Sequence, residues 1–304
     1  MTPRVLVVGD VINDLIVRPL SATVPDSDTR AEIVQRPGGS AANQACWLGL
    51  LGAPVTFVGR VGRADLDRHV AELRRWGVQP ALVADDTETG SIVIVVAEGA
   101  RTMYVDRGAN LNLHERDVPE AAWADAGLLH LTGYSFFERG TRAAALALLD
   151  RARARGVPVS VDPSSVGFLS EVGPEEFLRW TDGAELCFPN RAEAALLTGT
   201  DDPAEAAVRL TERCRTAVVT LDADGAVVAS RGSAPVAIPA LPGPVLDTTG
   251  AGDAFCAGFL RRWTVDRDPV AAARDAVRVA TSALRRLGGR PGPVAELAAG
   301  APAT

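Results

Sequence analysis

A glycine-rich string near the carboxyl end of the chain contains the groups that phosphoryl transfer requires. It reads Asp247-Thr248-Thr249-Gly250-Ala251-Gly252-Asp253-Ala254-Phe255, and an apolar helical pattern continues to Trp263. Glycines at a helix start let the backbone approach a ligand, and the unpaired N–H groups of the first turn can then bind an anion. Asp253 follows this turn and could accept a proton from a hydroxyl that attacks a bound phosphate. The simpler alternative is that Asp253 only caps the helix.

A second glycine pair precedes another helical pattern near residue 40. Pro37-Gly38-Gly39-Ser40-Ala41-Ala42-Asn43 leads into an expected helix over residues 40–51, with Ser40 as its predicted N-cap. Asn43 falls on the first turn, where its amide could contact a polyol, and the glycines allow close backbone approach. An ordinary helix start with a capping asparagine would look the same, so this motif alone leaves both interpretations open.

Lysine is absent from the chain, and all 31 basic residues are arginines. P-loop kinases need a lysine at the phosphates, protein kinases need a strand lysine, and Schiff-base enzymes need a reactive amine. The composition excludes these three classes. Any phosphate chemistry must therefore use backbone N–H groups, arginine and metal.

Short apolar runs alternate with helical patterns and would position these motifs. The expected strands cover residues 4–9, 55–58, 128–131, 157–161, 185–188 and 217–221, and the expected helices include 66–76, 142–155, 191–197 and 203–213. The alternation predicts an α/β fold, with a doubly wound, mostly parallel sheet flanked by helices. Residues 14–37 and 90–107 break the rhythm, and the second segment is a β-rich hairpin with Glu98-Gly99 near its turn. We expect them to form a small β-sheet lid on a single domain over residues 1–304.

Composition also limits the partners of the chain. With a net charge of −7 and scattered arginines, no basic stripe predicts binding to nucleic acid or to a membrane surface, and no apolar run approaches the ~20 residues of a membrane span. The three histidines lack metal-ligand spacing. The cysteines are far apart, which favours reduced thiols and a cytoplasmic location; they are Cys46, Cys187, Cys214 and Cys256.

Together, the motifs GGSAAN near residue 40 and DTTGAGDAF near residue 250 resemble the two signatures of the ribokinase-like sugar kinases, the PfkB family of carbohydrate and nucleoside kinases. The resemblance covers nearly the whole chain. It implies a ribokinase-like fold, ATP and Mg²⁺ as cofactors, and transfer of the γ-phosphoryl group to a hydroxyl of a small carbohydrate. It also implies that Asp253 is the catalytic base and that Gly250, Ala251 and Gly252 form the anion hole.

The same resemblance assigns further site residues. Asp14 matches an acidic residue that holds sugar hydroxyls from the first strand, and the other substrate-side matches are Gly38, Gly39 and Asn43. The matches on the nucleotide and metal side are Asn190, Thr220 and Gly225 for the nucleotide, Glu193 for the magnesium region, and Asp247 and Thr249 for a potassium ion that some members bind. Asn190 to Glu193 would also fit an ordinary helix start. Asp222 stands where the family usually has glycine, which leaves its role open.

The residues leave the acceptor undecided. Thr132 stands where ribokinases place a glutamate on ribose, so strict ribose specificity is not expected. Ketodeoxygluconate kinases use an arginine that Arg107 matches and a second one where this chain has Val166. A sugar acid is thus an alternative through Arg107 alone, although Arg107 could simply pin the adjacent turn. A nucleoside is another alternative, with Tyr104 stacking on the base.

Two other classes of protein fit the sequence less well than a sugar kinase. A dinucleotide oxidoreductase lacks support, because no GxGxxG follows the first strand and Gly250-Ala251-Gly252 comes too late in the chain. A non-catalytic sugar-binding relative is disfavoured by the intact Asp253. A small-molecule sugar or nucleoside is the expected partner, and a homodimer formed through the lid is a further option.

Overall fold

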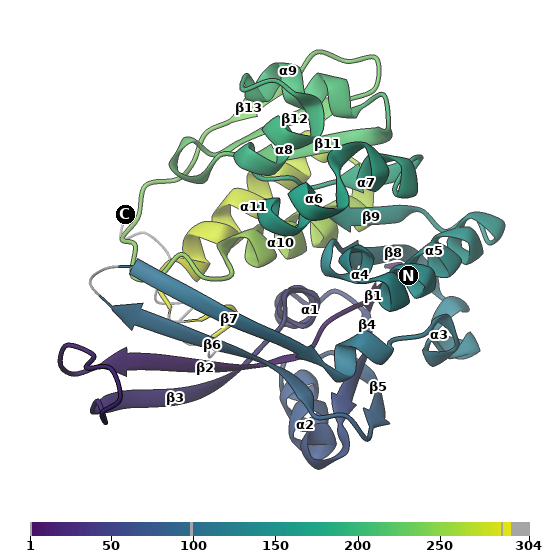
Figure 1. The fold of residues 1–304 in the computed structure, drawn as a ribbon. Coiled ribbons are helices and arrows are strands. Elements are labelled where there is room, and N and C mark those ends of the chain that lie inside the picture. Colours follow the sequence, from purple (N-terminus) through teal and green to yellow (C-terminus); the bar gives the residue numbers. More distant parts are fainter. Residues whose placement is uncertain (1, 98–99, 287, 293–304) are drawn as a thin grey trace.

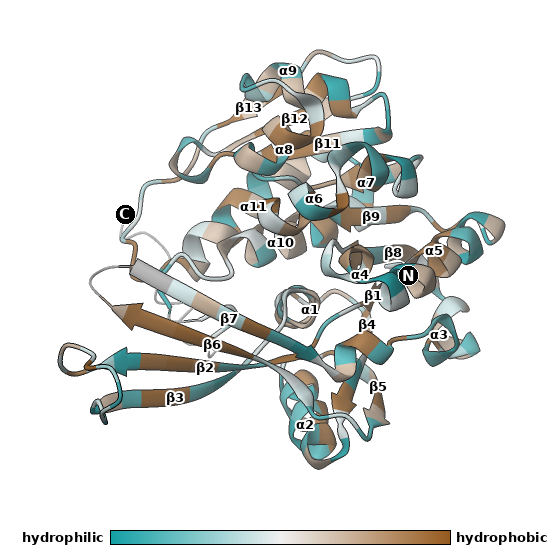
Figure 2. Cartoon of the chain, viewed as in Figure 1, coloured by the Kyte–Doolittle hydropathy of each residue, from teal (hydrophilic) through white to brown (hydrophobic). Residues whose placement is uncertain are grey.

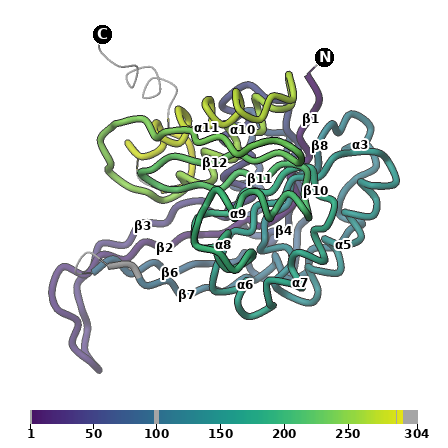
Figure 3. The backbone as a smooth tube through the Cα atoms, turned by 90° about the horizontal axis from the view of Figure 1, so that it is seen from above, coloured from purple at the N-terminus to yellow at the C-terminus, as the bar shows by residue number. Residues whose placement is uncertain are grey.

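The computed structural model describes residues 2–97, 100–286 and 288–292. These residues form a nine-stranded sheet with helices on both faces, and a separate four-stranded sheet projects from one side of it (Figures 1 and 3). In spatial order the large sheet contains β13 (Val236–Ile238), β12 (Ala226–Ser230), β11 (Cys214–Thr220), β10 (Ala184–Cys187), β9 (Val159–Asp162), β8 (Ala126–Thr132), β1 (Arg4–Val8), β4 (Val55–Gly62) and β5 (Gln79–Asp85). Every pairing from β11 to β5 is parallel, and β12 runs antiparallel to both of its neighbours.

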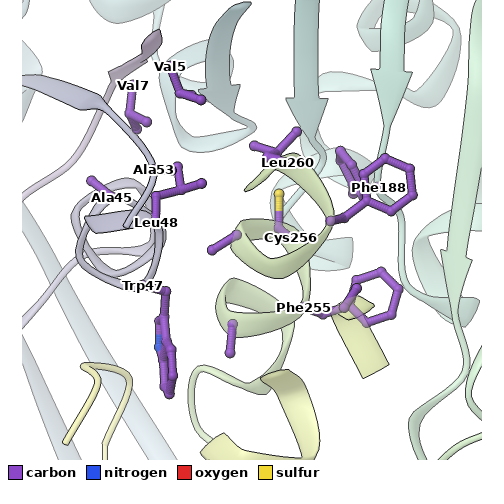
Figure 4. Close-up of a cluster of buried hydrophobic side chains, with 14 of the residues drawn as sticks. Val5, Val7, Ala45, Trp47, Leu48, Ala53, Phe188, Phe255, Cys256 and Leu260 are labelled. Atoms are coloured by element: carbon purple, nitrogen blue, oxygen red, sulfur yellow. The ribbon is translucent and has the colours of Figure 1, made fainter. Parts of the chain in front are cut away.

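Helices cover the two faces of this sheet because its central strands are apolar on both sides. On β1, Val5 and Val7 belong to one core cluster, and Leu6 and Val8 belong to the other. The first face is covered by α1 (Ser40–Leu50), α2 (Leu66–Arg75), α10 (Ala251–Asp266) and α11 (Pro269–Ala283). The second face is covered by α3 (Glu120–Trp123), α4 (Tyr134–Phe137), α5 (Arg139–Ala154), α6 (Val166–Val172), α7 (Pro174–Trp180), α8 (Arg191–Thr198) and α9 (Pro203–Leu210). Figure 4 shows α1 and α10 meeting over the first face, with Leu48 and Leu260 between the helices and the sheet.

The four-stranded sheet, which we call the small sheet, has the order β3-β2-β6-β7. Its strands are β2 (Ile12–Pro19), β3 (Ala31–Gly38), β6 (Thr89–Ala97) and β7 (Ala100–Gly108). Two antiparallel pairs are joined by the parallel pairing of β2 with β6, and apolar residues dominate β6 (Figure 2). These strands occupy the two segments for which the sequence predicts a lid. The expected turn at Glu98-Gly99 lies outside the described residues.

The prediction of a doubly wound, mostly parallel α/β fold is confirmed. Sequence patterns missed several elements, namely α3, α4, α6, α7, α11, β5, β12 and β13. Ser40 is not the N-cap of α1, because Gly39 takes that position with φ = 92°. In the described part of the chain, no helix has the length and apolarity that crossing a membrane requires.

The order of the strands determines where a ligand can bind. The chain passes from β1 to β4 and β5 on one side and then crosses to β8 on the other side of β1. In open α/β sheets, ligands bind at the carboxyl ends of the strands beside such a reversal. The small sheet lies at this edge, because β2 leaves the large sheet directly after β1.

Candidate active site

A cavity of about 420 Å³ lies between the carboxyl ends of the large sheet and one face of the small sheet. Asp10 follows β1, Tyr134 follows β8, Asp162 ends β9, Asn190 follows β10 and Thr220 ends β11, and all five line the cavity. Parallel strands bring these residues to one edge even though 210 positions separate the first from the last. The small sheet adds Asp14, Ile92, Ile94, Met103, Val105 and Arg107.

Most of the site residues predicted from the sequence line this one cavity. They are Asp14, Gly39, Asn43, Arg107, Asn190, Glu193, Thr220, Thr249, Gly250, Gly252 and Asp253. The others are Gly38, Ala251, Gly225 and Asp247, which do not line it. The motifs near residues 40, 190 and 250 therefore meet at one cavity.

Three side chains of α1 hold the carboxylate of Asp253, which lies on the first turn of α10. Ser40 Oγ donates to it at 2.7 Å, Asn43 Nδ2 at 2.9 Å and Gln44 Nε2 at 3.1 Å. Burial raises the pKa of Asp253 to about 6, and these hydrogen bonds oppose the rise. The carboxylate thus titrates close to neutral pH, where a general base is most effective.

The amino end of α10 presents backbone N–H groups to the cavity. Gly250 is the N-cap with φ = 75°, and a Cβ there would lie 2.4 Å from the Cα of Gly289, so the turn requires glycine. The amide of Ala251 donates to the carbonyl of Thr248 at 3.2 Å. Within the described chain, the amides of Gly250 and Gly252 have no acceptor. With the positive end of the helix dipole behind them, they can bind an anion.

Asp10 anchors the other helix start, and the sequence analysis missed it. Its carboxylate accepts from the amides of Ser40 at 3.3 Å and Ala41 at 3.1 Å. A Cβ on Gly39 would lie 2.5 Å from the carbonyl oxygen of Asp10, which explains the need for glycine next to this aspartate. The glycine pair therefore lets α1 begin directly above the end of β1.

Arg107 is the cationic residue in the cavity wall. Its Nη2 lies 3.6 Å from Asp10 Oδ2, and its guanidinium lies 4.5 Å from the ring centroid of Tyr134. Its carbonyl oxygen accepts from Asn110 Nδ2 at 2.8 Å, so its backbone, not its charge, supports the adjacent turn. The guanidinium remains at the cavity but already faces a carboxylate.

Asp14 lies in the cavity, but the expectation that it acts from the first strand is wrong. That strand ends at Val8, and Asp14 lies on β2 of the small sheet, opposite Ile92. Burial raises its pKa to about 7, an effect that nearby Arg290 opposes. A Cβ on Gly38 would lie 2.2 Å from Asp14 Oδ2, so Gly38 gives Asp14 its space without lining the cavity itself.

The Asn-x-x-Glu element forms a capping box at the start of α8. Glu193 N donates to Asn190 Oδ1, and Asn190 N donates to Glu193 Oε2, each at 2.9 Å. Asn190 also forms an isolated β-bridge with Thr220. Burial raises the pKa of Glu193 to about 7. Asn190 and Glu193 thus form an ordinary helix start and also line the cavity.

Gly225 and Asp222 belong to the turn between β11 and β12, outside the cavity wall. Gly225 has φ = 95°, and a Cβ there would lie 2.1 Å from the carbonyl oxygen of Ile238. Asp222 also adopts a left-handed conformation, with φ = 51°. A side chain in this conformation is strained, which gives a physical reason for the glycine that the resemblance implies at that position.

The carboxylate of Asp247 fixes the conformation of the glycine-rich string through hydrogen bonds. Its Oδ1 accepts from Thr249 N at 2.9 Å and Thr249 Oγ1 at 2.7 Å, and its Oδ2 accepts from Gly288 N at 2.9 Å. The string is thereby tied to the segment that follows α11. Thr249 lines the cavity, whereas Asp247 does not.

Sequence reasoning also missed a buried polar network behind Asp253. Gln44 Nε2 donates to Asp162 Oδ2 at 2.7 Å, and Gln44 Oε1 contacts His130 Nε2. Burial raises the pKa of Asp162, and the charges of Glu193 and Asp253 raise it further. The only sequence signal was the position of Gln44 directly after Asn43, because the other members are far apart in the chain.

Tyr104 is placed differently from the expectation that it could stack on a base. It pairs with Val93 and is 63% exposed, on the face of the small sheet opposite Met103 and Val105. Aromatic contact with a ligand is instead available from Tyr134 and from Phe168.

In the described ranges, no cluster of three or more histidine, cysteine or acidic side chains is arranged to hold a metal ion by itself. All four cysteines are free and buried.

Comparison with known proteins identifies the family. The family model described as "pfkB family carbohydrate kinase" matches residues 2–295. The chain belongs to the PfkB family of carbohydrate kinases. A fructokinase from Klebsiella pneumoniae is 30% identical over 272 residues, which is 86% of this chain and 84% of that protein.

Solved structures of PfkB kinases share the whole fold. An adenosine kinase from Sinorhizobium meliloti has a TM-score of 0.86 and 27% identity, covering 98% of this chain and 99% of its own. An aminoimidazole riboside kinase from Salmonella enterica, complexed with aminoimidazole riboside and an ATP analogue, has a TM-score of 0.78 and 25% identity, covering 97% and 99%. Ribokinases also match, which confirms the ribokinase-like fold. This PfkB protein is therefore a kinase of sugars or nucleosides.

Proposed function

We propose that this PfkB kinase transfers the γ-phosphoryl group of ATP to a hydroxyl of a sugar ring, with Asp253 as the general base. The observation that carries the proposal is the position of the Asp253 carboxylate, buried at the amino end of α10, beside the amides of Gly250 and Gly252, for which the described residues offer no acceptor. One helix start thus offers both a proton acceptor and an anion site. A non-catalytic relative would not need both.

In the proposed reaction, the ionised Asp253 accepts the proton of the attacking hydroxyl as its oxygen bonds to the γ-phosphorus of ATP, while the bond from that phosphorus to the β–γ bridging oxygen breaks and ADP leaves. The amides of Gly250 and Gly252 stabilise negative charge on the transferred group. Asp14 and Asn43 orient the acceptor, because both line the same cavity and can accept or donate hydrogen bonds to hydroxyls. The nucleotide lies toward Asn190 and Thr220.

The carboxylates of the cavity suit Mg²⁺, which prefers oxygen ligands and is often bound through one or two carboxylates together with substrate phosphates. Glu193 fits this role, since it is buried, lines the cavity and has no cationic partner among the described residues. When bound, the metal would neutralise charge on the phosphates. Thr249, with Asp247 behind it, remains the proposed region for a potassium ion.

The small sheet is proposed to be the lid of a single domain. Its inner face already lines one wall of the cavity, so a bound acceptor would lie between it and α10. Exclusion of water by such a lid prevents hydrolysis of ATP in place of transfer.

A nucleoside is the second candidate acceptor, and the small sheet provides the observation that favours it. Apolar side chains line the cavity, and they include Ile92, Ile94, Met103 and Val105 of the small sheet and Phe168 of α6. An apolar wall suits a base better than a free polyol. A sugar acid gains less support, because Asp10 already faces the charge of Arg107.

An ADP-release assay with ATP, Mg²⁺ and a panel of pentoses, hexoses, sugar acids and nucleosides tests this function. We expect acceptor-dependent ADP release with at least one sugar or nucleoside. If no acceptor raises ADP release above the ATP-only control, the proposed transfer to a sugar or nucleoside hydroxyl is wrong.

Two further proposals concern the oligomeric state of the enzyme and its location in the cell. Ile33 and Tyr104, on the outer face of the small sheet, are 64% and 63% exposed, so we propose that two copies pair through this face. A monomer in sedimentation equilibrium at tens of micromolar would exclude this dimer. The four free, buried cysteines support the proposal of a cytoplasmic location.

A further inference from the structure

We propose that Gln44, fixed by His130, is a positioning residue that directs its two amide hydrogens at Asp253 and Asp162 and so keeps Asp253 ready to accept a proton. This inference rests on the proposed role of Asp253. It adds a part of the site that lies behind the cavity and contacts no ligand.

Gln44 is fully buried on α1, and its side-chain nitrogen has three neighbours. Nε2 lies 2.7 Å from Asp162 Oδ2, 3.1 Å from Asp253 Oδ1 and 3.3 Å from Ser40 Oγ. An ionised carboxylate can only accept hydrogen bonds, whereas an amide nitrogen carries two donors. The NH₂ group can therefore bridge the two carboxylates with one hydrogen each.

The opposite amide orientation would place Oε1 against both carboxylates. Oxygen would then face Asp253 Oδ1 at hydrogen-bond distance, which is repulsive while Asp253 is ionised. The orientation of Gln44 thus decides whether Asp253 receives a donor on this side or faces an acceptor.

His130 fixes that orientation from behind. It is fully buried, with Nε2 against Gln44 Oε1 and Nδ1 2.9 Å from Ser160 Oγ. Burial lowers the pKa of His130 to about 3, so the ring is neutral and carries one hydrogen. If that hydrogen is on Nε2, it donates to Gln44 Oε1, and Ser160 donates to Nδ1. The Cys256 thiol, 3.9 Å from Nε2, is a more distant neighbour of the same nitrogen.

The residues form one chain from Ser160 through His130 and Gln44 to Asp253. A hydrogen bond to a carboxylate stabilises its ionised form and lowers its pKa. Other titratable or charged groups also face Asp253 and its neighbours; they are Asp10, Asp14, Arg107, Tyr134, Asp162, Cys256 and Arg290. Removal of the Gln44 donor also takes a hydrogen bond from Asp162 and leaves the other groups of this set in place.

The tautomer of His130 tests the proposal in the wild-type protein without any substrate. The chain has only three histidines, so ¹⁵N-histidine NMR resolves each ring, and a His69→Gln variant separates His69 from His130. We expect His130 to stay in the neutral Nε2–H form from pH 5 to pH 8. An Nδ1–H form would overturn the proposal, because Nε2 would then accept from the Gln44 amide and its oxygen would face the carboxylates.

Substitution of Gln44 tests the consequence for catalysis. Gln44→Met keeps a similar volume and removes the donor. With the acceptor found in the panel above, we expect the acidic limb of the kcat profile to move up by about one pH unit, while kcat at pH 9 changes less than about threefold. The matched control is Gln79→Met at an exposed strand position, which should leave the profile unchanged.

The two readouts separate this inference from the proposed function. A Gln44→Met enzyme with an unshifted acidic limb overturns the positioning role, even if its thermal stability falls. If the enzyme phosphorylates no acceptor, the proposed function fails, whereas the His130 tautomer still reports on the orientation of Gln44.

Discussion

At the scale of single residues, the site concentrates buried negative charge. Five carboxylates line one cavity, and they belong to Asp10, Asp14, Asp162, Glu193 and Asp253. The elevated pKa values of Asp14, Glu193 and Asp253, which arise mainly from burial, mean that ionising these groups costs the native state free energy. Functional sites commonly carry such a cost, since a charge-neutral cavity would be more stable but less reactive.

Replacement of Asp14 by asparagine should therefore stabilise the fold at neutral pH. Its folded-state pKa of about 7 lies above its unfolded value of 3.8. The native state thus holds this proton more tightly, and the associated stability is present below pH 4 and lost as the pH rises through 7. We expect Asp14→Asn to raise the free energy of unfolding by about 1–3 kcal/mol at pH 8 and by much less at pH 4. Urea denaturation at both pH values measures this.

Asp28→Asn, at an exposed position of the loop between β2 and β3, is the control for the loss of one negative charge. It should change stability by less than about 0.5 kcal/mol at either pH. A loss of stability at pH 8 in Asp14→Asn would contradict the assignment of Asp14 as a costly buried carboxylate.

Residue types and spacing predicted the parts of the site that are contiguous in sequence. The glycine-rich string predicted Asp253, and the second motif predicted Asn43, because each has a local pattern. Gln44, His130 and Asp162 could not be predicted in the same way. They are separated by tens of residues, and only the parallel sheet brings α1, β8 and β9 together.

At the scale of elements, the start of α10 is where backbone conformation and ligand binding meet. Gly250 and Gly252 look equivalent in the sequence, but the structure gives them different constraints. Gly250 has a left-handed φ and is packed against Gly289, whereas a Cβ on Gly252 meets nothing within 4 Å and Gly252 lines the cavity.

Alanine substitutions should separate these two roles. Gly250→Ala places a Cβ in a left-handed turn with no room, so we expect a loss of about 2 kcal/mol or more in stability. Gly252→Ala should fold as well as the wild type, but its methyl group enters the proposed phosphate site, so the KM for ATP should rise. Thermal denaturation together with ATP kinetics distinguishes the two variants.

The opposite result for this pair would contradict the assignment. If Gly252→Ala binds ATP normally, the anion is not bound at the first turn of α10. If Gly250→Ala is as stable as the wild type, the turn does not require its left-handed conformation.

The small sheet shows which properties of an element the sequence can predict. Its existence followed from two segments that are too long for simple loops, and the strands occupy those segments. The parallel pairing of β2 with β6 and the outward direction of Tyr104 did not follow, because register and facing depend on how the two hairpins meet.

At the scale of the whole molecule, the absence of lysine is consistent with a site that lies at the carboxyl ends of the strands and offers backbone amides to an anion. The large sheet ends in a cavity where the start of α10 presents amides that have no acceptor within the described chain, and Arg107 is the cationic side chain in the cavity wall. The alternation of strands and helices was sufficient to predict the doubly wound fold, since buried parallel strands read as short apolar runs. The antiparallel edge formed by β12 and β13 was missed because it lies beyond the last strand–helix alternation that the pattern resolved.

The central claim is that Asp253 takes the proton of the acceptor hydroxyl, and formation of phosphorylated product by Asp253→Asn tests it most directly. With the best acceptor from the panel, we expect the rate to fall by about 10²- to 10⁴-fold while the melting temperature stays close to that of the wild type. Asp266→Asn, at the other end of α10, should retain full activity. An Asp253→Asn enzyme that keeps more than about a tenth of the wild-type rate would contradict the assignment of Asp253 as the general base.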